Sequence, residues 1–126
     1  MISVTKRYSF EASHHLPYYE GACHNVHGHS YKVEVTVSGF PVNDIKSEKC
    51  GMIIDFKDLK SIIKTCIGMY DHQNLNKFFH NPTAEVMVER MFEDVNREIN
   101  KYHKNCCLEC IKLWETEDSY AMCVKE

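Results

Sequence analysis

Three histidines near the N-terminus have the residue type and the spacing of a catalytic metal site. His27 and His29 are separated only by Gly28, and side chains two residues apart on a β-strand project to the same face. Both imidazoles can therefore bind one ion. A catalytic zinc ion usually has three protein ligands and one open position, and His14 can supply the third ligand if two neighbouring strands pair. Zinc suits these donors best, although iron, nickel or cobalt could occupy such a site in vitro.

Cys23 is the candidate proton acceptor or nucleophile beside this site. It lies in a loop of Gly, Ala, His and Asn, and three residues separate it from His27. Cys66, by contrast, falls on an apolar helical stripe and is expected to be an inert core residue. A nearby metal ion and His24 would favour the thiolate form of Cys23. Three other histidines are interpreted as surface or hydrogen-bonded residues: His15, His80 and His103.

Two further elements carry groups suited to proton transfer and to ligand binding. Asp71 precedes His72 in a polar loop; imidazole transfers protons near neutral pH, and a carboxylate can orient its ring. The same pair is also common at ordinary helix ends. Glu115 follows Trp114 at the end of an apolar strand, where a buried carboxylate needs hydrogen-bond donors. The paired N–H groups of a pterin or a guanine would provide them, and an exposed strand-end glutamate is the equal alternative.

The composition is that of an ordinary globular protein. The chain has 126 residues, a formal net charge of −3 and seven cysteines, which predicts one domain over residues 1–126. No basic run is present, so the sequence argues against nucleic-acid binding. No apolar run approaches the ~20 residues that span a bilayer, and the N-terminus lacks a signal-peptide layout. We therefore expect a cytoplasmic protein, not bound to a membrane, with reduced thiols.

Hydrophobic periodicity predicts an α+β fold. The expected elements, in order, are a strand over residues 2–12, a strand over 31–38, a helix that starts after Asp55 and extends to about Tyr70, a helix that starts near 81–83 and extends to about Ile99, and strands over 108–115 and 120–125. Pro82 is expected in the first turn of the second helix. The simplest arrangement is a four-stranded antiparallel sheet with both helices on one face. Its open edges favour assembly of several copies into a closed barrel, so we expect an oligomer.

Six segments, taken together and in this order, resemble one known family. They are Phe10-Glu11-Ala12-Ser13-His14, Cys23-x-x-x-His27-Gly28-His29, Gly51-Met52-Ile53-Ile54-Asp55-Phe56, Asp71-His72-x-Asn74-Leu75-Asn76, Asn81-Pro82-Thr83-Ala84-Glu85 and Glu115-Thr116. The family is that of the 6-pyruvoyl-tetrahydropterin and 6-carboxy-tetrahydropterin synthases. The resemblance covers nearly the whole chain.

The resemblance implies a role for each candidate residue. Zn²⁺ would be held by three ligands: His14, His27 and His29. Cys23 would be the proton acceptor, Asp71 and His72 its partner pair, and Glu115 the anchor of the pterin ring. Thr83 and Glu85 match the segment that helps to line the pterin pocket. The implied fold is the tunnelling fold (T-fold), with trimeric rings stacked as homohexamers and active sites at subunit interfaces.

The spacing around Cys23 distinguishes between the reactions of the family. Animal-type 6-pyruvoyl synthases typically place this cysteine five residues before the His-Gly-His motif, whereas the spacing here resembles that of bacterial 6-carboxy enzymes of the queuosine (7-deazaguanine) pathway. The implied reaction converts 7,8-dihydroneopterin triphosphate to 6-carboxy-5,6,7,8-tetrahydropterin, acetaldehyde and triphosphate. The alternatives are a 6-pyruvoyl synthase, which keeps the carbon chain intact, and a non-catalytic pterin-binding protein.

Overall fold

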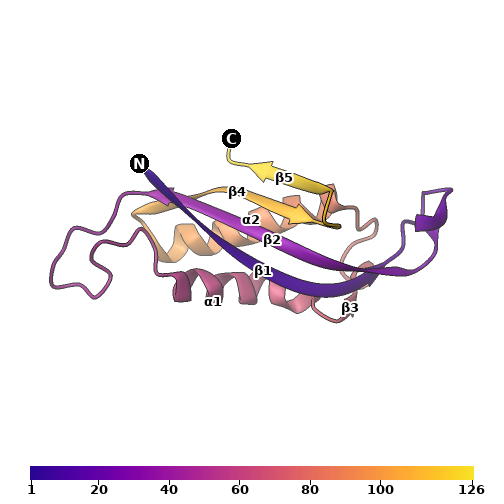
Figure 1. Cartoon of the computed structure of the whole chain (residues 1–126), viewed down its shortest axis with the longest axis horizontal. Coiled ribbons are helices and arrows are strands. Elements are labelled where there is room, and N and C mark those ends of the chain that lie inside the picture. The colour runs from indigo at the N-terminus through magenta and orange to yellow at the C-terminus, as the bar shows by residue number, and fades with distance from the viewer.

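Two long antiparallel strands organise the fold, which the computed structural model describes over residues 1–126 (Figure 1). β1 (Ile2–His14) and β2 (His27–Gly39) pair along their whole lengths, so His14 lies opposite His27. Both strands are longer than predicted, because the pairing continues into histidine-containing ends that lack apolar alternation. The condition for a three-histidine group, pairing of the first two strands, is therefore met.

The sheet has five strands in the order β3-β1-β2-β4-β5. The remaining elements are α1 (Phe56–Ile67), β3 (Gln73–Asn74), α2 (Ala84–Tyr102), β4 (Cys106–Trp114) and β5 (Tyr120–Val124). The predicted α+β class and order of the long elements are confirmed, but the prediction of four antiparallel strands is wrong. β3 pairs in parallel with Ala12 and Ser13 of β1, and a strand of two residues is too short to show a hydrophobic period.

Polar side chains start both helices. The carboxylate of Asp55 accepts a hydrogen bond from the Lys57 backbone N–H (2.8 Å), which confirms Asp55 as the N-cap of α1. In α2 the N-cap is Thr83, whose hydroxyl accepts from the Val86 N–H (3.2 Å). Pro82 therefore lies before the helix, and the prediction that it lies in the first turn is wrong. Its carbonyl group, on the chain that enters α2, is thereby free to accept a bond from elsewhere.

The helices cover one face of the sheet (Figure 1). Strand alternation places the candidate metal ligands on this same face. The inward-facing residues of β2 are fully buried: Tyr31, Val33, Val35 and Val37. His29 and His27 continue the same alternation toward the start of the strand, and His14 is only 1% exposed. None of the helices is long and apolar enough to cross a bilayer, and all seven cysteines are unpaired.

Candidate metal centre and adjoining pocket

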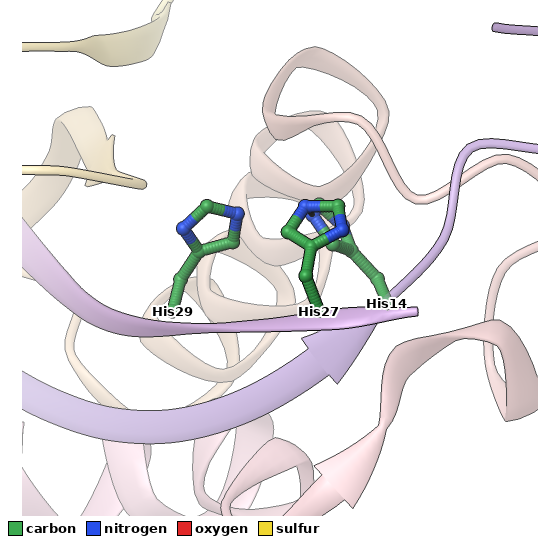
Figure 2. A group of neighbouring side chains, drawn as sticks. All are labelled: His14, His27 and His29. Atoms are coloured by element: carbon green, nitrogen blue, oxygen red, sulfur yellow. Dashed lines mark hydrogen bonds between the residues drawn. The ribbon is translucent and has the colours of Figure 1, made fainter. Parts of the chain in front are cut away.

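The ends of β1 and β2 bring three imidazoles to one point (Figure 2). One nitrogen from each of His14, His27 and His29 lies within 4.8 Å of the other two. The Nε2 atoms of His14 and His27 are 3.1 Å apart. This is the grouping predicted from the H-x-H spacing and the pairing of the two strands.

Backbone carbonyl groups determine which imidazole nitrogen is available. Nδ1–H of His14 donates to the carbonyl oxygen of Pro82 (2.8 Å), and Nδ1–H of His27 donates to that of Asn25 (2.7 Å). A neutral imidazole has one donor and one acceptor nitrogen, so both Nε2 atoms carry lone pairs. Hydrogen bonds of this kind commonly hold metal-binding histidines in their tautomer and orientation.

A cation between the Nε2 atoms relieves two conflicts in this arrangement. The lone pairs of His14 and His27 otherwise face each other, and the buried Nε2 of His29 has no hydrogen-bond partner. Zinc–nitrogen bonds of ~2.0–2.1 Å place two ligand nitrogens of a tetrahedral ion ~3.3 Å apart, close to the observed separation. Burial lowers the pKa of His14 and that of His29, which favours the neutral form that a ligand must have. The three histidines therefore form a group that can bind a metal ion.

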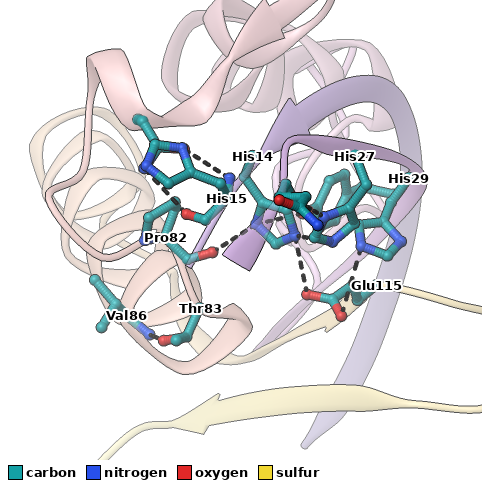
Figure 3. Close-up of polar contacts among 11 residues, drawn as sticks. His14, His15, His27, His29, Pro82, Thr83, Val86 and Glu115 are labelled. Carbon is teal, nitrogen blue, oxygen red and sulfur yellow. Dashed lines mark hydrogen bonds and ion pairs between the residues drawn. The ribbon is translucent and has the colours of Figure 1, made fainter. Parts of the chain in front are cut away.

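Glu115 connects this group to a large pocket. Its carboxylate oxygens lie 3.8 Å from Nε2 of His29 and 4.0 Å from Nε2 of His14 (Figure 3). The same side chain lines a pocket of about 800 Å³ together with Thr83 and Glu85. The three residues predicted to bind the pterin therefore share one cavity, and Glu115 is the member that also adjoins the imidazoles.

The pocket has a distinct charge and shape. Its 13 lining residues include three glutamates and no lysine or arginine: Glu85, Glu89 and Glu115 are the charged ones. Leu16 and Tyr19, from the segment just before Cys23, form one side of the pocket. Residues 119–123, largely β5, form another side. Such a lining accepts hydrogen bonds from N–H groups of a planar heterocycle and disfavours a polyanion.

Asp71 and His72 form the predicted pair at the edge of the sheet. Oδ2 of Asp71 lies 3.0 Å from Nδ1 of His72, and Oδ1 accepts from the backbone N–H of Glu11 (2.9 Å). The Glu11 bond, and then the His72 contact, hold the pKa of Asp71 below its usual value. His72 donates its backbone N–H to the Glu11 carbonyl (2.6 Å) and has a φ of +59°, a left-handed conformation that is uncommon for residues other than glycine.

The imidazole of His72 does not join the metal group. It lines a pocket of about 440 Å³ with Glu11, Ser13 and Ser30, which alternate with the inward-facing residues and so belong to the opposite face of the sheet. His29 is the one member of the metal group that reaches the wall of this pocket. Within one chain, therefore, neither Asp71 nor His72 belongs to the metal group or lines the Glu115 pocket.

Cys23 lies in the connection between β1 and β2, in a 3₁₀ turn over Ala22–His24. Its side chain is half-buried and its carbonyl oxygen accepts from the Leu16 N–H (2.8 Å). The thiol is not one of the ligand atoms that cluster within 4.8 Å. The structure thus places Cys23 on the segment that precedes His27 but not in the metal group itself.

Comparison with known proteins identifies the family. A model of the 6-pyruvoyl tetrahydropterin synthase family matches residues 3–126. The chain belongs to this family. It is 33% identical to 6-carboxy-5,6,7,8-tetrahydropterin synthase of Haemophilus influenzae, over 95% of this chain and 96% of that protein. It is 34% identical to a putative 6-carboxy-5,6,7,8-tetrahydropterin synthase of Archaeoglobus fulgidus, over 90% and 87%.

The solved structures agree with the sequence relatives. The 6-pyruvoyl tetrahydropterin synthase of Caenorhabditis elegans superimposes with a TM-score of 0.80 at 25% identity, over 99% of this chain and 96% of that one. The predicted T-fold is therefore confirmed, with the difference in strand number described above.

Several groups help to build the site although the sequence predicted no role for them. The carbonyl oxygens of Pro82 and Asn25 carry no sequence signal, because every residue has such an oxygen. The Asn76 side chain forms two hydrogen bonds with the His15 backbone. Its Oδ1 accepts from the His15 N–H (2.9 Å), and its Nδ2 donates to the His15 carbonyl (3.1 Å). Tyr19 of the pocket stands beside Tyr18 in the sequence, and nothing in the order of residues distinguishes the two.

Proposed function

We propose that this protein converts 7,8-dihydroneopterin triphosphate and water to 6-carboxy-5,6,7,8-tetrahydropterin, acetaldehyde and triphosphate, using Zn²⁺. The observation that carries the proposal is the place of Glu115, which lines the pocket and also lies within 4.0 Å of two metal-group imidazoles. A heterocycle held by this carboxylate would have its substituent beside the three histidines that would hold the metal. The relatives that bear the 6-carboxy synthase name support this choice among the reactions of the family.

The lining of the pocket indicates how the substrate lies. Glu115 accepts hydrogen bonds from the paired N–H groups of the pterin, and Thr83 and Glu85 line the same cavity. Because three glutamates and no cationic side chain line the pocket, the triphosphate extends away from it. The basic residues that bind the triphosphate thus lie outside this cavity.

Zn²⁺, rather than another metal, suits three neutral imidazoles with an open fourth position. When held by His14, His27 and His29 it supplies Lewis-acid activation of the side-chain oxygens. Cys23 takes a proton from the substrate side chain, and His72, oriented by Asp71, transfers protons. The Asp71 carboxylate accepts from the Glu11 backbone N–H, and the His72 backbone N–H donates to the Glu11 carbonyl. These two bonds keep the pair at a defined position on the sheet edge.

We further propose that the active site forms between subunits of a homohexamer. In one chain His72 lies outside the metal group and lines a different pocket from that of Glu115, so the pair serves a metal centre of a neighbouring subunit. Subunit mixing tests this arrangement. C23A and H72A homo-oligomers should each be inactive, and refolding the two together should restore activity in mixed oligomers. A mixture that stays as inactive as its components would refute shared sites.

Product identification tests the reaction. Zinc-loaded protein is incubated with 7,8-dihydroneopterin triphosphate, and the products are separated by chromatography with mass detection. Acetaldehyde and 6-carboxy-tetrahydropterin support the proposal. A 6-pyruvoyl product would instead place the protein with the pyruvoyl synthases, and unchanged substrate would favour the non-catalytic pterin-binding alternative.

The role of Cys23 has its own test with a matched control. C23A should abolish turnover while the zinc content stays at the wild-type level, because the thiol lies outside the metal group. C50A is the control, since Cys50 is an exposed thiol between β2 and α1 and outside the metal group. Turnover by C23A at the rate of C50A would exclude Cys23 as the base.

A further inference from the structure

Two adjacent tyrosines in the connection between β1 and β2 have different environments. The Tyr18 hydroxyl forms a hydrogen bond with Nε2 of His80, and Tyr18 is absent from the lining of the Glu115 pocket. Tyr19 lines that pocket, together with Glu115 and Thr83. The chain therefore uses one tyrosine to attach the loop to its surroundings and presents the other to the ligand cavity.

The backbone around Tyr19 holds its ring in this place. The Tyr19 N–H donates to the Leu16 carbonyl (3.1 Å), and the Leu16 N–H donates to the Cys23 carbonyl (2.8 Å), which closes the loop. The ring packs over Gly21 so closely that a Cβ atom on Gly21 would lie 2.6 Å from Cε1 and 3.3 Å from Cδ1 of Tyr19. Gly21 is therefore the residue that leaves room for the ring.

The pocket has two aromatic side chains, and Tyr19 is the one without an aromatic partner. Tyr120, the other one, packs on Trp114 with ring centroids 4.4 Å apart. Tyr19 is 54% exposed and belongs to no aromatic pair. A planar ligand in the cavity would cover an unpaired phenol face at one side while Glu115 binds its edge.

We propose that Tyr19 is a specificity-determining residue that packs its ring against the heterocycle bound by Glu115. This inference rests on the proposed pterin function and adds a residue to its substrate site. A planar conjugated bicycle gains both apolar burial and ring–ring contact from such a neighbour, and the carboxylate alone would accept hydrogen bonds from many N–H compounds. Tyr19 thus selects flat heterocycles among molecules that can bind Glu115.

The contact affects binding more than chemistry. Tyr19 touches the heterocycle, which keeps its place throughout the reaction, so the contact stabilises ground state and transition state alike and changes KM more than kcat. Removal of one aromatic stacking partner of a nucleobase typically costs a factor of about 5 to 150 in affinity. We expect the KM of Y19A to rise by at least about fivefold on this scale, with kcat within a factor of about three.

Four variants and one probe test the proposal. The probe is neopterin, a fluorescent pterin without phosphate groups, whose binding is measured by titration without turnover. Y19A should bind neopterin at least about fivefold more weakly than the wild type, and Y19F should bind it normally because the ring is retained. G21A should weaken binding too, because the new Cβ displaces the Tyr19 ring. Y102A is the control and should bind like the wild type, because Tyr102 is an exposed tyrosine at the end of α2, outside the pocket.

The outcomes separate this proposal from the proposed reaction. If Y19A binds neopterin as tightly as Y102A, or if the wild type does not bind neopterin, the role of Tyr19 is refuted. Suppose that the wild type binds neopterin, that Y19A does not, and that the wild type leaves 7,8-dihydroneopterin triphosphate unchanged. The role of Tyr19 is then supported and the proposed reaction is refuted. If turnover occurs and the KM of Y19A is that of the wild type, only the role of Tyr19 fails. Circular dichroism of each variant checks that the fold is intact.

Discussion

Replacing Thr83 by alanine should destabilise the protein through the start of α2. The Thr83 hydroxyl accepts the bond from the Val86 N–H (3.2 Å) that caps this 19-residue helix. Loss of a threonine N-cap typically costs ~1 kcal/mol. An unfolding entropy of ~2.1 cal/mol/K per residue gives about 0.26 kcal/mol/K for 126 residues, so Tm should fall by about 4 °C. Calorimetry and urea denaturation of the metal-free protein measure both quantities.

The same substitution should affect the metal group to a smaller degree. Thr83 follows Pro82, whose carbonyl oxygen accepts the bond from Nδ1–H of His14, so a loosened helix start loosens the support of one ligand. Direct loss of such a supporting bond typically weakens metal binding ~10–100-fold. In T83A the carbonyl group is retained, and the loss of affinity, measured by competition with a chromophoric chelator, should stay below that range.

The serine variant provides the control for Thr83. T83S keeps the capping oxygen and should have nearly the wild-type stability, since serine and threonine are both good N-caps. If T83A unfolds with the same free energy as T83S, the hydroxyl–Val86 bond contributes nothing, and the assignment of Thr83 as the cap that supports this part of the site is wrong.

Three further predictions concern the metal, a buried thiol and a carboxylate. Metal at about 100 times its Kd should raise the unfolding free energy by ~2.7 kcal/mol and Tm by about 10 °C. Alanine at any of the three histidines should remove this shift in thermal scans. An equal shift in such a variant would refute the metal site. Burial raises the pKa of Cys66 to about 11, so a thiol reagent at pH 8 should modify exposed Cys50 quickly and Cys66 only on unfolding; equal rates in the folded protein would contradict this. Because the Glu11 N–H and then His72 lower the pKa of Asp71, the stability that Asp71 contributes is fully present above pH ~4 and is lost as the pH falls through the folded pKa. Denaturation at several pH values should show that loss in the wild type and not in D71N, and parallel pH profiles would refute it.

Regular elements with a buried face were predictable from the sequence. The alternation from Tyr31 to Val37 predicted the central strand, because one face of it is buried against helices and the other is not. Asp55 was predictable as an N-cap because its side chain bonds a backbone group two residues away. Such signals are local, so the residue types alone carry them.

Features that depend on distant partners were not predictable in this way. The two-residue strand β3 exists because Asp71 and His72 bind the backbone of Glu11, 60 residues earlier in the chain. Thr83 rather than Pro82 borders α2, and the helix pattern alone could not decide between neighbouring positions. Tyr18 and Tyr19 diverge only because His80 and Gly21 surround them differently.

The sequence by itself determined the chemistry available at the site, and the tertiary structure decided how it is assembled. Residue types and short spacings place two imidazoles on one strand face, since the side-chain period of a strand is two. Convergence of His14 on that pair required the register of β1 against β2, and its tautomer required a carbonyl group 68 residues away. The position of Glu115 between pocket and imidazoles likewise depends on how β4 pairs with β2. Spacing along the chain determines to which face of a strand neighbouring side chains point, whereas distances between remote residues are set only when strands pair and helices pack.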